Sequence, residues 1–306
     1  MYGVDLFGSP ITQRTTGPIA ERFGFAPFSV LDARAGEWQD RKRAWSAVGI
    51  KGEVGRSAKS YECHDWMNEK GGGQRGDGDG TSIFDPVLCE CVYRWFSAPG
   101  AQVVDPFAGG SVRGIIAGML GRRYWGCDLR SEQVDANRIQ ADEIMPDIRP
   151  EWVCADAMDA LDTSPDADLL FSCPPYGDLE RYSDDPRDLS TQEWHTFAAN
   201  YSRIILRATK RLKPDRFACF VVGDFRDKRG FYRDFVSATI AAFKAAGAEL
   251  YNEAVLVTPV GSACMRVTKQ FQSGRKFAKT HQNVLVFCKG DWRKAAKAAE
   301  GNDNAK

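Results

Sequence analysis

Short runs of hydrophobic residues recur from residue 101 onward, and longer amphipathic segments separate most of them. Nearly continuous hydrophobic runs predict strands buried on both faces of a sheet, and the amphipathic segments predict the helices that cover those faces. The last two runs have no predicted helix between them, so we expect these strands to pair antiparallel. The pattern predicts an α/β fold with a seven-stranded, mostly parallel sheet, its strands at residues 101–105, 122–128, 151–156, 166–173, 216–225, 248–260 and 281–289.

Glycine-rich, polar residues at 69–80 divide the chain. We expect this segment to be a linker or a mobile loop. Residues 81–292 then hold the α/β domain, preceded by an N-terminal extension at residues 1–68. Residues 293–306 are expected to form a flexible C-terminal tail.

Composition narrows the class of protein. Basic and acidic residues number 41 each, so the net charge is zero and any nucleic-acid contact depends on local patches. The nine cysteines follow no disulfide or zinc spacing, which favours a reducing compartment and no metal site. No hydrophobic run reaches the roughly 18 residues of a membrane span. We therefore expect a soluble cytoplasmic protein that makes no membrane contact.

A glycine-rich turn, DPFAGGS at residues 105–111, follows the first predicted strand. Ligands of a doubly wound sheet bind at the carboxyl ends of its strands, and glycine lets the backbone approach them closely. The turn is not G-x-G-x-x-G, so we expect no dinucleotide site. It resembles the D-x-F-x-G-x-G loop of class I (Rossmann-like) S-adenosylmethionine (SAM) methyltransferases. Asp105, Phe107 and Gly109 match, and Ser111 replaces the second glycine, adding a side chain near the cofactor.

Two more acids end the next two predicted strands, Asp128 and Asp156. A carboxylate at Asp128 can accept hydrogen bonds from both hydroxyls of a ribose. Asp156 stands where the resembled family has an acid or amide near the adenine amino group. Each acid alone is equally an ordinary helix cap, but acids at three successive strand ends make SAM the expected cofactor.

Upstream, TSIFDP at residues 81–86 resembles the segment that in DNA methyltransferases helps to hold the methionine end of SAM. The resemblance implies cofactor contacts from Ser82, Phe84 and Asp85. Simple capping of the following helix by Asp85 is the alternative, and the two roles are compatible.

The fourth predicted strand ends in Cys173-Pro174-Pro175-Tyr176. It resembles the [D/N/S]-P-P-[Y/F/W] motif of SAM-dependent methyltransferases that act on adenine N6 or cytosine N4. The resemblance implies that a flipped base stacks on Tyr176 while the first motif residue and the Pro174 carbonyl accept hydrogen bonds from its amino group. The prolines stiffen the turn, and catalysis is mainly positioning for an in-line displacement.

Cys173 departs from this motif, because a neutral thiol is a poor hydrogen-bond acceptor. Three interpretations stay open. Cys173 is a tolerated variant, or it is a nucleophile that adds to C6 of a pyrimidine as in C5-cytosine methyltransferases, with Glu253 as candidate acid. In the third, the protein only binds SAM or DNA without catalysis. RNA methylation is a further alternative, since RNA and glutamine methyltransferases use variants of Pro-Pro-Tyr.

THQNVLVFCKG at residues 280–290 resembles the H-E-x-x-L-x-F-x-K closing strand of many DNA amino methyltransferases. Residues 23–45 and 251–262 resemble segments of phage- and prophage-encoded DNA methylases. The resemblance covers most of residues 20–292. It implies double-stranded DNA as substrate, a DNA-methylation role such as restriction-modification, and a host cytoplasm if the protein is phage-encoded.

Basic residues in two segments are candidates for contact with DNA phosphates. The first segment is in the N-terminal extension, between two tryptophans. The alternative interpretation is that these tryptophans only dock the segment to the main domain. No long insertion resembles a target-recognition domain, so specificity is short, or depends on residues 1–80, on a specificity partner or on a second copy of the chain. The candidate contacts are Arg41, Lys42, Arg43, Arg275, Lys276 and Lys279.

Overall fold

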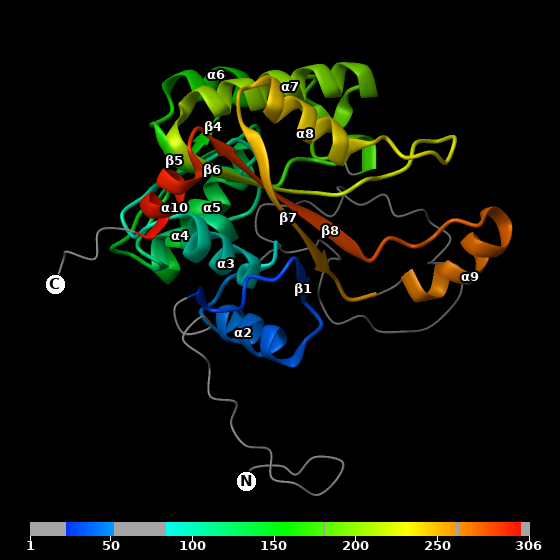
Figure 1. Ribbon diagram of the computed structural model, residues 1–306, viewed down its shortest axis with the longest axis horizontal. Coiled ribbons are helices and arrows are strands. Elements are labelled where there is room, and N and C mark those ends of the chain that lie inside the picture. The colour runs from blue at the N-terminus through cyan, green and yellow to red at the C-terminus, as the bar shows by residue number, and fades with distance from the viewer. Residues whose placement is uncertain (1–22, 52–83, 180, 261–262, 301–306) are drawn as a thin grey trace, which may run out of the picture.

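One twisted sheet runs through the part of the chain that this computed structural model describes, residues 23–51, 84–179, 181–260 and 263–300 (Figure 1). Its eight strands are ordered β1-β7-β8-β6-β5-β2-β3-β4. The predicted linker at 69–80 lies outside the described residues. The strands are β1 (Val30–Asp32), β2 (Gln102–Asp105), β3 (Arg123–Asp128), β4 (Glu151–Cys154), β5 (Ala167–Ser172), β6 (Leu212–Val222), β7 (Glu249–Val257) and β8 (His281–Lys289).

Strand β8 pairs antiparallel with both β6 and β7, and the other neighbouring strands pair parallel. The predicted mostly parallel sheet with an antiparallel last strand is therefore confirmed. The expectation that no helix separates the last two strands is wrong, because α9 (Ala263–Gly274) lies between β7 and β8; the two strands still pair antiparallel. From β2 to β6 each strand is connected to the next one along the chain over a helix, which brings the carboxyl ends of these strands to one edge of the sheet.

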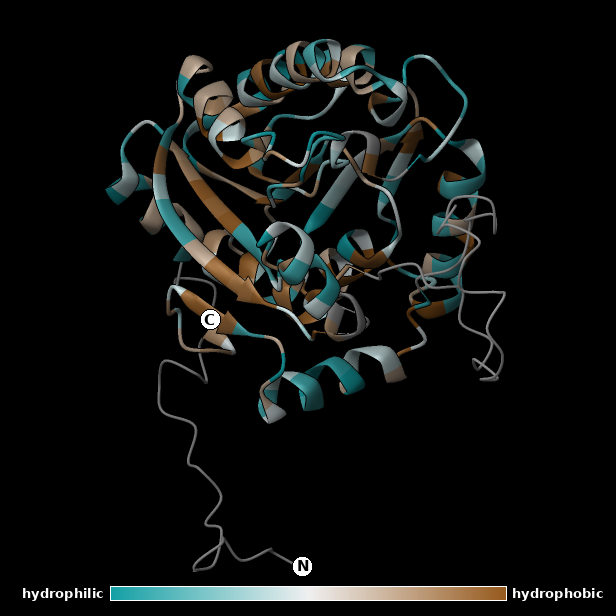
Figure 2. Ribbon diagram, turned by 90° about the vertical axis from the view of Figure 1, so that its right-hand side faces the viewer, coloured by the Kyte–Doolittle hydropathy of each residue, from teal (hydrophilic) through white to brown (hydrophobic). Residues whose placement is uncertain are grey.

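Helices cover both faces of the sheet (Figure 1). Successive strand residues point to opposite faces, so Val103 packs into the hydrophobic cluster on one face of the sheet and Val104 packs into the cluster on the other face. Figure 2 shows hydrophobic strands between helices with hydrophilic outer surfaces. The helices are α2 (Gly36–Ala47), α3 (Pro86–Phe96), α4 (Val112–Met119), α5 (Ser131–Ile144), α6 (Ala157–Thr163), α7 (Trp194–Arg211), α8 (Phe235–Ala245), α9 (Ala263–Gly274) and α10 (Trp292–Glu300).

The N-terminal extension supplies the eighth strand, which the hydrophobic pattern did not predict. Strand β1 has only three residues and pairs parallel with β7, Val30 opposite Val255. Helix α2 follows it and packs on α3 through Trp38 and Trp45, which are 2% and 7% exposed. Residues 30–47 therefore belong to the main fold, and the expected boundary at residue 68 does not separate them from it.

The C-terminal segment also differs from expectation. Residues 292–300 form helix α10 instead of a flexible tail, and α10 packs against β6 and α3. Ala295 is 1% exposed, and Ala299 on the same helix face packs against the same core. Alanines four residues apart give this short helix one small hydrophobic face, which is enough to fix it on the sheet.

Candidate active site

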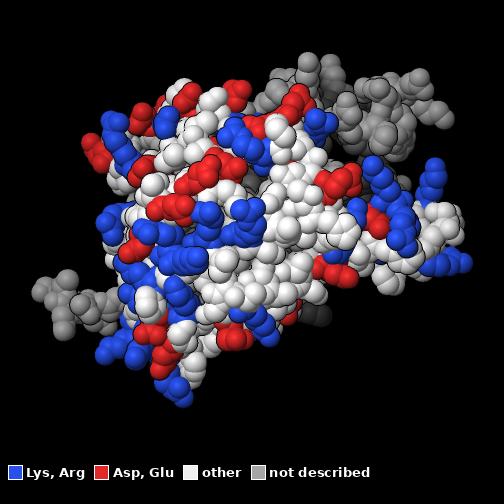
Figure 3. Space-filling model, turned by 90° about the horizontal axis from the view of Figure 1, so that it is seen from above, with Lys and Arg blue, Asp and Glu red and all other residues white. Residues whose placement is uncertain are grey.

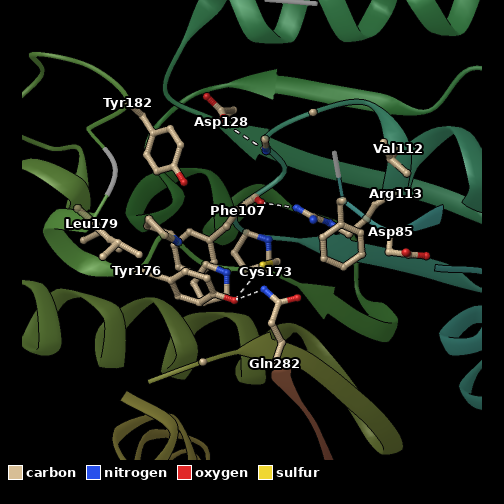
Figure 4. Close-up of a pocket in the computed structure, with 18 of the residues that line it drawn as sticks. Asp85, Phe107, Val112, Arg113, Asp128, Cys173, Tyr176, Leu179, Tyr182 and Gln282 are labelled. Atoms are coloured by element: carbon tan, nitrogen blue, oxygen red, sulfur yellow. Dashed lines mark hydrogen bonds between the residues drawn. The ribbon is translucent and has the colours of Figure 1, made fainter. Parts of the chain in front are cut away.

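A cavity of about 680 Å³ opens at the carboxyl edge of the sheet. Residues that end or follow β2, β3, β4, β5 and β6 line it, as does Gln282 at the start of β8 (Figure 4). Binding sites of α/β sheets lie at this edge, and the volume is within the range of about 300–1,000 Å³ that small ligands occupy.

Hydrogen bonds to its backbone fix the conformation of the glycine turn. Gly109 has φ = 50°, a conformation that favours glycine, and its N–H donates to Asp128 at 3.1 Å. Asn137 Nδ2 donates to the Gly109 carbonyl at 2.7 Å, and Gln133 in turn donates to Asn137 at 2.9 Å. Helix α5 thus fixes the backbone of the turn through two buried amides.

Asp128 ends β3 on the wall of the cavity. One carboxylate oxygen accepts the Gly109 N–H, and the other accepts the Arg130 N–H at 2.9 Å. Burial raises the pKa of Asp128 above its ordinary value, although the backbone donors and the Arg130 charge oppose the shift. Each oxygen keeps a lone pair for a further donor from the cavity.

Asp105 does not face the cavity, contrary to its expected contact with a cofactor. Its carboxylate is fully buried and accepts hydrogen bonds from Arg113 at 2.6 Å, Tyr124 at 2.8 Å, Ser172 at 2.5 Å and the Phe107 N–H at 3.1 Å. Arg113 also donates to the Phe107 carbonyl at 2.6 Å. Asp105 therefore joins the glycine turn to the end of β5, and Phe107 lines the cavity in its place.

Ser111 also points away from the cavity, so the expected side chain near the cofactor is absent there. Its hydroxyl donates to Gln140 Oε1 at 2.6 Å, and Gln140 Nε2 donates to the Lys51 carbonyl at 3.0 Å. The serine that replaces the second glycine therefore anchors the start of α4 to α5 and to the segment after α2.

Asp156 and Asp85 each cap a helix and line the cavity at the same time. Asp156 accepts the Met158 N–H at 2.8 Å, and Asp85 accepts the Val87 N–H at 2.9 Å. The capping interpretation is correct for both. Capping leaves Asp156 a second carboxylate oxygen, whereas the second oxygen of Asp85 accepts hydrogen bonds from Lys42 at 3.2 Å and Trp38 at 3.3 Å. Of the other two residues in the upstream segment, Phe84 lines the cavity and Ser82 lies outside the described residues.

The basic residues of α2 dock this helix instead of forming a free phosphate-binding patch. Arg41 donates twice to Glu90 of α3 at 2.7 Å, Trp45 donates to the same carboxylate at 2.7 Å, and Lys42 donates to Asp85 at 3.2 Å. Burial by itself would raise the pKa of Glu90, but the bonds from Arg41 and Trp45 lower it below its ordinary value. The tryptophan-docking alternative is therefore correct.

The remaining expected phosphate contacts lie elsewhere. Arg43 pairs with Asp40 on the outer side of α2. Lys279 lines the cavity, where burial lowers its pKa against the opposing charge of Asp224. Arg275 and Lys276 lie on the surface at the end of α9 and do not line the cavity.

The Cys-Pro-Pro-Tyr turn forms the floor of the cavity between the glycine turn and β8 (Figure 4). Cys173 Sγ lies 3.8 Å from the Tyr176 hydroxyl, and Gln282 Nε2 donates to that hydroxyl at 2.8 Å. The Tyr176 ring packs against Phe235 with centroids 6.0 Å apart. Burial raises the pKa of Tyr176, so its hydroxyl stays protonated in this setting.

Gln282 is one of the cavity residues that the sequence analysis missed, although it occupies the glutamate position of the H-E-x-x-L-x-F-x-K pattern. Its amide nitrogen donates to Tyr176, and among the described residues no donor reaches its amide oxygen. The pattern itself was the available signal. The pattern does not reveal that β8 lies between β6 and β7 in the sheet, and this strand order brings Gln282 beside Tyr176.

Within the described part of the chain, no group of three His, Cys, Asp or Glu side chains is placed to hold a metal ion. Cys89 and Cys91 are fully buried on α3, and burial raises the pKa of both thiols. None of the described helices is both long and hydrophobic enough to cross a membrane.

Comparison with known proteins found no matching family model and no similar curated protein. The chain is similar in structure to TrmN from Thermus thermophilus, with 18% identity and a TM-score of 0.42 over 67% of this chain and 49% of that one. It is also similar to SAH-bound magnesium protoporphyrin IX methyltransferase (ChlM) from Synechocystis PCC 6803, with 12% identity and a TM-score of 0.48 over 72% and 91%. A candidate DNA modification methylase, also from Thermus thermophilus, matches over 45% and 51%, with 16% identity and a TM-score of 0.34. This chain thus spans about half the length of TrmN.

The strand order is the decisive observation on the fold. Parallel strands run β4-β3-β2-β5-β6, antiparallel β8 lies between β6 and β7, and the glycine turn follows β2. The fold is that of class I methyltransferases. One fold supports many different reactions, so the residues that line the cavity indicate the activity and the fold alone does not.

Proposed function

We propose that this protein is a SAM-dependent methyltransferase that transfers a methyl group to an exocyclic amino group of a DNA base, adenine N6 or cytosine N4. The observation that carries the proposal is one cavity that joins the Gly109–Asp128 wall to the Cys-Pro-Pro-Tyr floor. The first part suits a nucleoside cofactor, and the second suits a planar amino-bearing substrate.

The cofactor side of the cavity fits SAM. All four candidate residues line the cavity: Asp128 would accept hydrogen bonds from the ribose hydroxyls, Asp156 would lie near the adenine amino group, and Asp85 and Phe84 would lie near the methionine end. The left-handed backbone at Gly109 allows close approach without a side chain in the way. Bound SAM supplies an electrophilic methyl group; the chain's own residues supply orientation.

On the substrate side, the residues act on an amino group. The base stacks on the Tyr176 ring, and the Pro174 carbonyl accepts one amino hydrogen. The Cys173 thiol is a weak acceptor for the second hydrogen. We assign that contact to the amide oxygen of Gln282, whose nitrogen is held by Tyr176 at 2.8 Å. Two acceptors fix the amino nitrogen with its lone pair free for in-line attack.

The C5-cytosine alternative finds less support in the cavity. That chemistry needs an acid beside the pyrimidine N3 in addition to a thiolate. Glu253, its candidate acid, is exposed on β7, accepts a hydrogen bond from Asn283 at 2.9 Å and does not line the cavity. Cys173 is better explained as a variant whose acceptor role is taken over by Gln282.

The test is methyl transfer from isotopically labelled SAM to DNA and, in parallel, to RNA, with nucleosides resolved by mass spectrometry. N6-methyladenine or N4-methylcytosine in DNA supports the proposal. Label in 5-methylcytosine would instead establish Cys173 as a nucleophile. Label in RNA alone, or none in either polymer despite measurable SAM binding, would reject it.

A further inference from the structure

Two segments protrude on the same side of the molecule, the loop at residues 226–233 after β6 and the segment at residues 263–279 that contains α9 (Figure 1). They contact each other, because a Cβ atom added at Gly230 would lie 2.5 Å from Lys276 Nζ. We refer to them together as the basic–aromatic surface. We propose that this surface binds the DNA strand on either side of the target base, through its phosphates and by base stacking. The inference rests on the proposed function.

The sequence of the two segments is rich in positive charge. The two segments contain nine basic residues and one acidic residue, Asp227, in a chain whose net charge is zero. Figure 3 shows several Lys and Arg side chains at the end of the molecule where α9 lies, on a face that also carries basic side chains elsewhere. A phosphate backbone is the partner that such an excess of positive charge attracts.

Exposed aromatic rings are interleaved with these cations. Phe231 is 63% exposed and Phe277 is 75% exposed. The Arg229 guanidinium lies 5.3 Å from the Phe231 ring centroid, and Arg275 lies 5.3 Å from that of Phe271. Phe271 and Phe277 stack with centroids 5.9 Å apart. Rings and guanidinium planes at the surface are the groups on which unpaired bases stack.

The basic–aromatic surface is continuous with the mouth of the cavity. Arg226 donates to the Gly230 carbonyl at 2.9 Å and lies 4.0 Å from the Tyr232 ring centroid, which holds the loop in a hairpin. Phe225 at the start of the loop and Lys279 at the end of the α9 segment both line the cavity. A strand lying across the surface would therefore enter the cavity beside Tyr176.

A second basic group, on α7, serves as the comparison. Arg207 pairs with Asp162 at 2.5 Å and Arg211 pairs with Asp166 at 3.0 Å, so acids partly neutralise it. It lies on a helix face that carries no exposed aromatic ring among the described residues. We expect it to make no specific contribution to DNA binding.

The experiment measures DNA binding by the full chain with a fluorescently labelled duplex over a range of salt concentrations. Phe231→Ala combined with Phe277→Ala should raise the dissociation constant at least about tenfold. Arg229→Ala combined with Arg275→Ala should reduce the slope of log affinity against log salt by about 2. The matched controls are Ile139→Ala, an exposed hydrophobic residue on α5, and Arg203→Ala with Arg207→Ala on α7, all of which should bind DNA as the wild type does.

SAM affinity, measured by calorimetry, should be unchanged in all these variants, which shows that each is folded. Wild-type affinity in both surface variants, or equal losses in the controls, would overturn the inference while leaving methyl transfer by the wild type intact. Preferential binding of RNA, or of a second copy of the chain, would also overturn it. Failure of the proposed function looks different: the wild type would bind DNA through this surface but transfer no methyl group.

Discussion

Replacing Gln282 with leucine removes the amide oxygen that we assign to the target amino group while keeping a side chain of similar size. The amino nitrogen gains positive charge as it is methylated, so the hydrogen bond that it donates to the Gln282 oxygen strengthens in the transition state. A hydrogen bond to a charged group contributes about 1.5–3 kcal/mol, and about 1.4 kcal/mol corresponds to a factor of ten in rate. Gln282→Leu should therefore lower kcat about 10- to 150-fold.

The substitution also removes the donor to the Tyr176 hydroxyl at 2.8 Å. Tyr176→Phe deletes that contact and keeps the Gln282 oxygen, so it separates the two effects and should lower kcat much less. Gln282→Glu keeps an acceptor at the same place and should retain most of the activity. Cys173→Asn introduced together with Gln282→Leu supplies a new acceptor from the other side and should restore part of the lost rate.

The assay is the initial rate of methyl transfer to DNA with both substrates saturating, with SAM affinity measured separately. A loss confined to kcat, with unchanged SAM affinity, is the expected result. The reasoning is refuted if Gln282→Leu transfers methyl groups at the wild-type rate, or if Tyr176→Phe loses as much activity as Gln282→Leu.

Three further predictions concern the thiol, the cofactor wall and the docked helix. Cys173→Ser should keep or raise methyl transfer, because a hydroxyl accepts hydrogen bonds better than a thiol; near-complete loss would indicate a covalent mechanism. Asp128→Asn should weaken SAM binding about 10- to 150-fold. In the wild type, SAM affinity should also fall as the pH is lowered, because protonated Asp128 is a poorer acceptor. This fall should begin at a higher pH than it would with an exposed aspartate, because burial raises the pKa of Asp128. Calorimetry across pH tests both, and an affinity that is flat in acid would contradict them. Arg41→Ala should lower the free energy of unfolding by about 1–2 kcal/mol at neutral pH. This value is smaller than that of a fully buried ion pair, because solvent screens the partly exposed Arg41. The pKa of Glu90 is lowered in the folded state, so the stability lost in Arg41→Ala is fully present above the ordinary glutamate pKa and should shrink as the pH falls through the lowered pKa. Denaturant unfolding of the wild type and the variant at several pH values measures this difference in stability.

Local pattern was sufficient for much of the fold. The hydrophobic runs that became β2, β3, β5, β6 and β8 are long enough to be recognised, and helices on both faces of the sheet bury most of their residues, so their composition reflects their position directly. The glycine turn and the Cys-Pro-Pro-Tyr turn were predictable for a related reason. Backbone conformation at Gly109 and in the Pro174-Pro175 step is set by the residues themselves.

Helix α10 and strand β1 were not predictable in this way. Strand β1 has three residues, and its place in the sheet depends on pairing with Val255 and its neighbours, far away along the chain. Helix α10 presents only alanines to the core, which is a weak hydrophobic signal. In both, the stabilising contacts are long-range, and a local window of sequence does not contain them.

The sequence by itself determined the class of fold, the edge of the sheet where the cavity lies, and the turn that forms its floor. Tertiary structure decided which way each polar side chain faces. It turned Asp105 and Ser111 inward, placed Arg41 on Glu90, and brought Gln282 beside Tyr176. The physical reason is that a buried polar group must find a partner, and the partners available to it come from whichever strands and helices the fold packs around it.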